Sequence, residues 1–244
     1  MIRYGLIGKP LSHSFSQRYF TEKFRREGLA DHRYDLFGID RAEDLRTLIA
    51  ATPGIRGLNV TIPYKQTVMP LLDAIDPLAA AVGAVNTIKI EGDRLTGFNT
   101  DVEGFRQTLL RLLNKKKPRA LVLGSGGASR AVAFALREQG IKFRVVSRSR
   151  DRGDMTYALL EPIVVDVCTL IINTTPLGMH PDVASMPPLP YEAIGGKHVL
   201  IDLVYNPVET RFLQEGRKRG AVIANGLDML HAQAEASWRI WNGA

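Results

Sequence analysis

The sequence is poor in the residues that build disulfide frameworks, metal centres and membrane spans. It has one cysteine, Cys168, which excludes an intramolecular disulfide. Its five histidines are scattered, and no cluster of histidine, cysteine and acidic residues has metal-ligand spacing, so we expect no metal. No uninterrupted apolar run approaches the length of a membrane span, and no signal-peptide pattern opens the chain. We therefore expect a cytoplasmic protein with no membrane partner.

The composition is otherwise that of a globular protein with a basic surface. Hydrophobic residues make up 45% and charged residues 23% of the 244 residues, enough for one large domain or two modest ones. The net charge of +7 favours anionic partners. The longest basic run, Lys115 to Lys117, has no interleaved aromatic residues and is expected to be a solvated loop. Nucleic acid is therefore not an expected partner.

Short apolar strands alternate with segments of helical period along the whole chain. Strands are predicted at residues 2–7, 34–39, 55–60, 85–90, 94–97, 119–123, 143–146, 170–173, 198–202 and 222–224. Helices are predicted at residues 16–27, 42–50, 101–113, 128–139 and 228–241. This alternation is typical of α/β proteins whose parallel sheets are covered on both faces. Because the pattern restarts after Pro118, we predict two α/β units, residues 1–100 with 226–244, and residues 101–225.

A cluster of hydrogen-bonding groups follows the third predicted strand. Asn59, Thr61 and Lys65 place an amide, a hydroxyl and an ammonium within seven residues. Pro63 has no N–H and ends strand pairing there. This pattern is typical of a site for a small polyhydroxylated ligand. The alternative is a polar turn with a solvated lysine.

A glycine-rich turn joins the strand at 119–123 to the helix at 128–139. Gly124 permits a tight turn, and Gly126 lets backbone N–H groups approach a pyrophosphate at a helix N-terminus. Ser129 replaces the third glycine of the usual dinucleotide pattern, so a plain glycine turn remains the alternative.

The end of the next strand indicates which dinucleotide would bind. An NAD enzyme places an acidic residue there for the ribose 2′-hydroxyl. Here Ser147 and Ser149 alternate with Arg148, Arg150 and Arg152. Arginine binds phosphate in a bidentate manner, so the segment predicts NADP, although Asp151 weakens the cluster. The alternative is a solvated charged loop.

Taken together, these segments resemble the shikimate dehydrogenase family. The resemblance spans nearly the whole chain and rests on motifs at residues 12–16, 59–65, 83–87, 99–101, 124–129, 173–179, 202–205 and 226–233. It implies a substrate domain and a Rossmann-type NADP-binding domain separated by a cleft. It implies catalytic roles for Lys65 and Asp101, and substrate binding by Ser14, Ser16, Thr61, Asn86, Tyr205 and Gln233. It assigns the cofactor to Gly124, Ser125, Gly126, Gly127, Ala128, Ser147, Arg148, Arg152, Thr174 and Gly226.

The sequence departs from the family pattern in three places. Ser147 replaces an asparagine that is usual before Arg148. The stretch between Arg152 and Leu170 is short, so one strand–helix crossover must be reduced. The chain also stops soon after Trp241, without a further C-terminal helix that many members carry. The first two departures bear on the cofactor, and none touches the expected substrate residues.

The resemblance implies reversible reduction of 3-dehydroshikimate to shikimate by NADPH, in chorismate and aromatic amino-acid biosynthesis. Lys65 would stabilise the developing alkoxide and handle its proton, while Asp101 would hold the lysine and a substrate hydroxyl. An ordinary salt bridge between the two is the alternative. Two other functions stay open: a broader quinate/shikimate dehydrogenase, and a non-catalytic paralogue that senses NADP or a metabolite. A small molecule is the expected partner, and a homodimer is left open.

Overall fold

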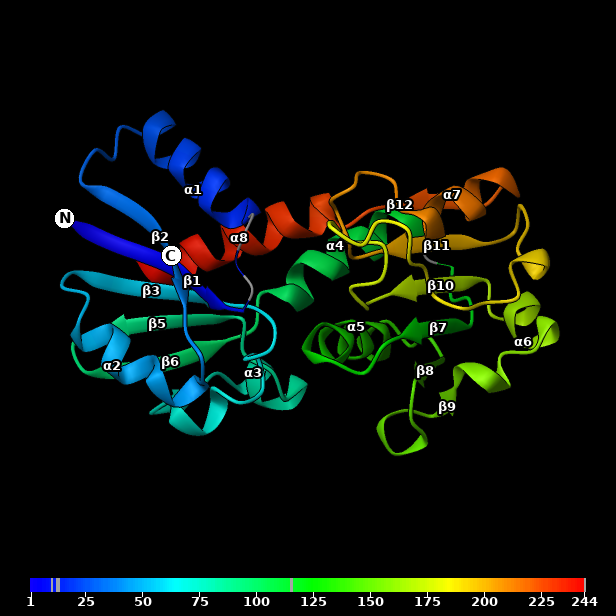
Figure 1. The fold of residues 1–244 in the computed structure, drawn as a ribbon, viewed down its shortest axis with the longest axis horizontal. Coiled ribbons are helices and arrows are strands. Elements are labelled where there is room, and N and C mark those ends of the chain that lie inside the picture. The colour runs from blue at the N-terminus through cyan, green and yellow to red at the C-terminus, as the bar shows by residue number, and fades with distance from the viewer. Residues whose placement is uncertain (10, 12–13, 115, 244) are drawn as a thin grey trace. The chain divides into compact units, whose positions relative to one another are not determined.

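The chain folds into two compact units, and Figure 1 shows its helices and strands. The structure is a computed structural model that describes residues 1–9, 11, 14–114 and 116–243. Unit 1 comprises Met1–Thr100 and Ala234–Ala244, and unit 2 comprises Asp101–Gln233. Ser12 and His13 of the N-terminal serine motif, and Lys115 of the basic run, lie outside the described residues.

Unit 1 is built on a six-stranded sheet in the order β2-β1-β3-β5-β6-β4. Its strands are β1 (Ile2–Gly8), β2 (His32–Gly38), β3 (Ile55–Val60), β4 (Ala74–Ile75), β5 (Thr87–Glu91) and β6 (Arg94–Phe98). β1, β2 and β3 are parallel, whereas β5 runs antiparallel to both β3 and β6. The sheet is therefore mixed rather than wholly parallel, because β5 and β6 form the predicted hairpin around Gly92.

Helices cover both faces of this sheet. On β1, the side chains of Tyr4 and Leu6 point to one face, where they pack against α1 (Phe15–Arg26) and α8 (Leu227–Asn242). Ile7 points to the other face, and α2 (Leu45–Ala50) and α3 (Pro77–Val82) pack there. The 3₁₀ turns η1 (Ala42–Asp44) and η2 (Met69–Leu71) belong to the same layer. The period-2 alternation of β1 thus separates the two cores.

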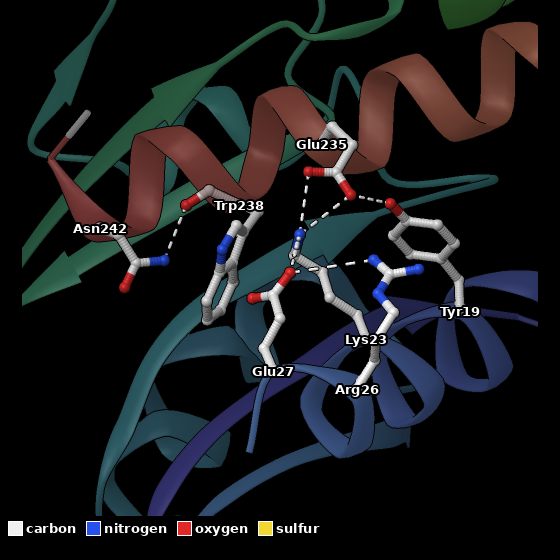
Figure 2. A network of polar contacts seen from close by, with 7 residues as sticks. All are labelled: Tyr19, Lys23, Arg26, Glu27, Glu235, Trp238 and Asn242. Carbon is white, nitrogen blue, oxygen red and sulfur yellow. Dashed lines mark hydrogen bonds and ion pairs between the residues drawn. The ribbon is translucent and has the colours of Figure 1, made fainter. Parts of the chain in front are cut away.

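The end of α8 is tied to α1 by a partly buried ionic network, which Figure 2 shows. The ammonium of Lys23, a side chain only 6% exposed, bonds both carboxylate oxygens of Glu235 at 3.0 Å and Glu27 at 2.8 Å. Tyr19 donates a further hydrogen bond to Glu235. Burial would raise the pKa of Glu235, but the hydrogen bonds from Tyr19 and Lys23 outweigh it and lower that pKa. Lys23 also lies over the ring of Trp238, 5.6 Å from its centroid.

The two tryptophans, Trp238 and Trp241, are packing residues. Trp241 is 6% exposed, stacks on Tyr4 and donates from Nε1 to the carbonyl of Ile88 at 3.0 Å. Gly57 of β3 faces the indole, and a Cβ at that position would overlap the ring. This glycine is required by the close approach of the helix rather than by a turn.

Unit 2 is built on a parallel six-stranded sheet in the order β12-β11-β10-β7-β8-β9. Its strands are β7 (Ala120–Leu123), β8 (Phe143–Ser147), β9 (Met155–Thr156), β10 (Leu170–Asn173), β11 (Val199–Asp202) and β12 (Val222–Ala224). The chain runs outward from β7 to β9, then returns beside β7 at β10 and continues to β12. This is the doubly wound order, with its topological switch between β7 and β10.

Helices lie on both faces of this sheet as well. α5 (Gly127–Glu138) packs on β7 and β8, and α4 (Asp101–Leu113) packs on α5. The opposite face carries α6 (Pro162–Val167) and α7 (Arg211–Lys218), and Cys168 is buried beside α6. The remaining 3₁₀ turns are η3 (Arg150–Arg152), η4 (Tyr157–Leu159) and η5 (Tyr191–Ala193). The short stretch from Arg152 to Leu170 holds β9, η4 and the six-residue α6. The connection from β8 to β9, whose residues are all described, lies mostly before this stretch and contains η3 but no α-helix.

Candidate active site

The segment after β3 lies at the carboxyl ends of the parallel strands of unit 1. The Thr61 N–H donates to the carbonyl of Ile7 at 2.9 Å, so this segment begins beside the end of β1. The Lys65 carbonyl accepts the N–H of Val85 at 2.7 Å. Thr61, Lys65 and the segment that carries Asn86 therefore lie together at one edge of the sheet, where ligands of open α/β sheets bind. The side chains of Thr61 and Lys65 are half-buried.

Asn59 differs from the two polar residues that follow it, because its amide is used inside the protein. It is 4% exposed, accepts the Tyr34 hydroxyl at 2.8 Å and donates to Ser237 at 3.0 Å and Thr87 at 3.3 Å. Of the three donors predicted to form a ligand site, Asn59 is therefore a structural residue. It ties β3 to β2, β5 and α8 beneath the segment that carries Thr61 and Lys65.

Asn86 is also held by neighbours from the chain itself. It is 2% exposed, its Oδ1 accepts the Thr100 N–H at 2.7 Å, and its Nδ2 donates to the Thr100 hydroxyl at 2.9 Å. Thr87 and Ser237 join the same group of hydroxyls through a contact of 2.8 Å. Sequence reasoning assigned no role to Thr100 or Ser237. Its position between the motif residues Asn99 and Asp101 was an available signal for Thr100 alone.

The two predicted carboxylate-binding serines flank the start of α1. Ser14 is the N-cap of this helix and makes no side-chain capping bond, and it is half-buried. Ser16 is 8% exposed. Burial raises the pKa of Tyr34, and a hydrogen bond with Ser16 opposes part of that rise. Ser16 is thus linked through Tyr34 to Asn59.

Three of the predicted catalytic and substrate-binding residues lie in unit 2. Asp101 is the first residue of α4 and is 5% exposed, at the end of the helix where the dipole favours a carboxylate. Tyr205 follows β11 and is half-buried. Gln233 is 6% exposed and donates from Nε2 to the carbonyl of Leu230 at 3.0 Å.

The glycine turn lies at the switch point of the unit 2 sheet. Gly124 has φ of +110°, and a Cβ there would come within 2.7 Å of the Thr174 hydroxyl, so only glycine fits without strain. Thr174 follows β10 and donates its hydroxyl to the carbonyl of Leu123 at 2.7 Å. The structure therefore brings the predicted cofactor residues Gly124 and Thr174 together, although they are far apart in the sequence.

The start of α5 suits an anion. Its N-cap is Gly126, which makes no side-chain capping bond, and a Cβ at Gly126 would have no atom within 4 Å. Gly126 therefore offers no side-chain acceptor to the first N–H groups of this helix, from Gly127 and Ala128. A pyrophosphate fits such a helix N-terminus.

The end of β8 suits a second phosphate. Ser125 and Ser147 approach each other to 3.5 Å between hydroxyl oxygens, so the glycine turn and the end of β8 adjoin. Arg148, Arg150 and Arg152 have exposed or half-exposed side chains, and no carboxylate of the described residues forms an ion pair with them. Three unneutralised guanidiniums at this strand end fit the 2′-phosphate of NADP rather than a bare ribose.

Gly226 lies at the last strand end of unit 2, where β12 leads into α8. It is buried, its N–H donates to the carbonyl of Val204 at 3.2 Å, and a Cβ would overlap the carbonyl of Leu203. This close approach holds the segment that carries Tyr205 against the start of α8.

A buried carboxylate organises the same edge. Asp202, at the end of β11, is 0% exposed and accepts hydrogen bonds from Asn173 and the Val204 N–H at 3.0 Å each and from Thr210 at 2.5 Å. Burial raises the pKa of this carboxyl to about 6, and these hydrogen bonds oppose part of the rise. Asn173 in turn accepts the N–H and hydroxyl of Thr175 at 3.0 and 2.6 Å. The sequence offered one signal for Asp202: an acidic residue closing an apolar strand.

Two classes of site have no candidate in the described part of the chain. No group of three or more histidine, cysteine, aspartate or glutamate side chains there could hold a metal ion. None of the helices described is both long enough and apolar enough to cross a membrane.

Comparison with known proteins gives one consistent family. The model of the shikimate dehydrogenase substrate binding domain matches residues 6–88. A shikimate dehydrogenase (NADP(+)) from Moorella thermoacetica is 39% identical over 98% of this chain and 87% of its own length. The solved shikimate 5-dehydrogenase from Thermus thermophilus, in complex with NADP(H) and shikimate, is 35% identical. It superposes with a TM-score of 0.88 over 100% of this chain and 94% of that one.

A solved quinate dehydrogenase is also similar. The enzyme from Corynebacterium glutamicum, in complex with NAD, is 31% identical and has a TM-score of 0.88 over 100% of this chain and 94% of that chain. The fold is therefore shared by proteins that are named for different substrates and were solved with different cofactors, and the side chains of the site must distinguish them.

Proposed function

This chain belongs to the shikimate dehydrogenase family, and on that premise we propose that it interconverts 3-dehydroshikimate and shikimate with NADP. It is an NADP-dependent oxidoreductase that acts on a CH–OH group. The observation that carries the proposal is the similarity to NADP-dependent relatives along 98% of the chain, which includes every motif assigned above. A cytoplasmic location and a homodimer remain predictions.

We propose that Lys65 and Asp101 handle the proton of the reaction. NADPH supplies the hydride when it is bound. The Lys65 ammonium would hydrogen-bond the carbonyl oxygen of 3-dehydroshikimate, stabilise the negative charge that develops there and donate the proton. Asp101, at the N-terminus of α4, would accept a hydrogen bond from a neighbouring hydroxyl of the substrate and favour the charged form of Lys65.

The neutral polar residues would orient the substrate. Ser14 and Ser16, at the start of α1, suit the carboxylate of shikimate, and Thr61, Asn86, Tyr205 and Gln233 suit its hydroxyls. Support comes from the position of Thr61 and Lys65 at the carboxyl edge of the sheet, where they lie beside the segment of Asn86. Because Asn86 and Ser16 are also bonded within the chain, their positions are fixed before substrate arrives.

The cofactor residues divide by the group that they would hold. The pyrophosphate would bind the N–H groups of Gly127 and Ala128 and the hydroxyl of Ser125. Arg148 and Arg152 would bind the 2′-phosphate, with Ser147 beneath them. Thr174 would line the switch point and Gly226 the end of β12, and neither would contribute charge. The uncapped start of α5 and the unpaired arginines support this assignment.

The direct test is oxidation of shikimate by the purified protein with NADP, followed through the absorbance of NADPH. We expect turnover with shikimate and NADP, and a fall in kcat of about a hundredfold to ten-thousandfold in Lys65→Ala. Lys89→Ala is the matched control, because it removes a lysine that pairs with Glu91 on the hairpin of the same unit. Equal losses in the two variants would remove Lys65 from the proposed mechanism.

The alternatives have their own outcomes in the same assay. Faster oxidation of quinate than of shikimate, or faster turnover with NAD than with NADP, would identify the protein as a broader quinate/shikimate dehydrogenase. Binding of shikimate and NADP without turnover would make it a sensor. Arg148→Ala should weaken the binding of NADP by about tenfold and leave the binding of NAD unchanged, since only NADP carries the 2′-phosphate.

A further inference from the structure

A cavity of about 890 Å³ lies in unit 2, at the end of the sheet opposite the glycine turn. Its lining includes the first residues of β7 and β8, the turn after α5, and α6. The dinucleotide turn follows the carboxyl end of β7, and α5 follows the turn (Figure 1). The cavity lies at the amino end of the same strand and is therefore a separate site. Its volume is within the range of small-molecule pockets, roughly 300–1,000 Å³.

The wall of this cavity is apolar, and part of it is left exposed by α6. Ile163 and Val167 of this six-residue helix are 62% and 41% exposed, and both line the cavity with Ile141 and Phe143. Apolar side chains of this size are normally covered in a folded protein. An occupant with an apolar body would remove this surface from water, at roughly 25 cal/mol per Å².

The rim of the cavity is cationic. Arg119, Arg137, Lys142 and Arg144 come from three different segments of the chain and all line it. No carboxylate of the described residues forms an ion pair with any of the four. Arg137 lies over the ring of Phe143, 5.8 Å from its centroid, and so is held at the rim.

Acidic side chains on the bordering helices are engaged elsewhere. Glu138, at the end of α5, accepts Arg106 at 2.7 Å. Asp166, on α6, pairs with Lys197 at 2.6 Å. Four cations that face one cavity without intramolecular neutralisation create a local positive potential, and this potential attracts an anion.

From these observations we propose that the cavity binds a small organic anion with an apolar, ring-sized body, such as an aryl carboxylate or sulfonate. The anionic group bonds the guanidiniums of Arg119 and Arg144, and the body lies against Ile163 and Val167. A second copy of the chain suits the site less well, because each copy carries a net charge of +7 and the rim would face like charge.

The test uses 8-anilinonaphthalene-1-sulfonate, whose fluorescence rises in an apolar site, with the protein saturated by NADP. Saturation keeps the probe out of the dinucleotide site. We expect saturable binding, weakened about tenfold in Arg119→Gln/Arg144→Gln. The matched control is Arg94→Gln/Arg217→Gln, which removes the same net charge from exposed positions elsewhere and should change the Kd by less than about twofold.

A second measurement locates the probe. Ile163→Cys in a Cys168→Ala background places the only thiol on the exposed wall of the cavity. Saturating probe should slow alkylation of that thiol by N-ethylmaleimide about tenfold, because occupancy excludes the reagent.

Four results would overturn the proposal. Equal weakening in the two arginine pairs would mean attraction by net charge alone. Unchanged alkylation would place the probe elsewhere. Binding of neutral N-phenyl-1-naphthylamine as tightly as the sulfonate would remove the role of the cations. A dimer in sedimentation velocity that protects the same thiol would make this face an interface between copies. None of these outcomes depends on dehydrogenase activity.

Discussion

The two units place different chemistry at the buried polar edges of their sheets. Unit 1 uses neutral groups: the amides of Asn59 and Asn86 and the hydroxyls of Thr87, Thr100 and Ser237. Unit 2 uses a carboxylate, Asp202, which accepts from Asn173, Thr210 and a backbone N–H. Both networks connect strands that adjoin predicted site residues, but only the second contains a group that titrates near neutral pH.

This contrast determines how each unit responds to conditions. Amides and hydroxyls keep the same donors and acceptors at any pH near neutrality, so the neutral network gives unit 1 a pH-independent framework. A carboxylate is a stronger acceptor, but its charged form is costly to bury. Unit 2 therefore has a tighter network whose free energy depends on pH.

Asp202→Ala is expected to cost the most stability. The variant removes the acceptor of three buried donors at once, although Asn173 retains the carbonyl of Leu177 at 3.4 Å. We expect a loss of on the order of 4 kcal/mol in the free energy of unfolding of unit 2. Hydrogen exchange of residues 199–202 measures it, and Thr169→Ala, on the loop before β10, is the control that should change little. A loss below about 1 kcal/mol would show that water replaces the carboxylate.

The counterpart in unit 1 is Asn59→Ala. We expect this variant to lower the free energy of unfolding of unit 1 by on the order of 3 kcal/mol. Tyr34, Ser237 and Thr87 would each lose a partner, although the last two retain each other at 2.8 Å. Both tryptophans of the chain, Trp238 and Trp241, lie in unit 1, so urea unfolding followed by tryptophan fluorescence reports this unit. A loss equal to or larger than that of Asp202→Ala would reverse the ranking of the two networks.

The pH dependence of unit 2 provides a third test. Burial raises the pKa of Asp202 from an ordinary 3.8 to about 6, so between these values the folded state binds more protons than the unfolded state. The contribution of this carboxyl to the free energy of unfolding must therefore fall as pH rises through this window, by on the order of 2 kcal/mol.

Asp202→Asn is the matching variant for the pH experiment. An amide retains the oxygen that Asn173 and Val204 use and can donate to Thr210, so the variant should fold and lose this slope. Hydrogen exchange of residues 199–202 at about pH 4 and about pH 6.5 measures the slope in both proteins. The same slope in Asp202→Asn would assign the pH dependence to another group.

Ser237→Ala should have the mildest consequence. Asn59 and Thr87 retain other partners, so the free energy of unfolding of unit 1 should fall by about 1 kcal/mol. This loss should be equal at about pH 4 and about pH 6.5, because no group of this network titrates between them. Tryptophan fluorescence in urea at both pH values measures it. A loss that changes with pH would contradict the neutral character of this network.

Elements with a clear apolar pattern could be predicted from the sequence, and residues 55–60, 101–113, 170–173 and 222–224 have the predicted bounds. β4 and α6 could not, because β4 has two residues and the six residues of α6 are too few for a helical period to appear. α3 and α7 were missed although each has a side-chain cap, Asp76 and Thr210, which was the available signal.

The site shows a different limit. Thr61, Lys65 and Thr174 lie at strand ends, as their motifs indicated. Asn59 could not be assigned from the sequence, because an amide serves a ligand or the protein equally well. Its partner Ser237 is 178 residues away, and only the fold brings the two together.

The contact between Gly57 and Trp241 also constrains the order in which the two units can complete their folding during synthesis. The indole of Trp241 fills the space left by a missing side chain in β3, yet it is synthesised after the whole of unit 2. Unit 2 is continuous in the chain, so it is complete before this indole is made and can fold first. Unit 1 closes only when residues 234–243 have been added, so its strands, which are synthesised before unit 2, finish folding after it.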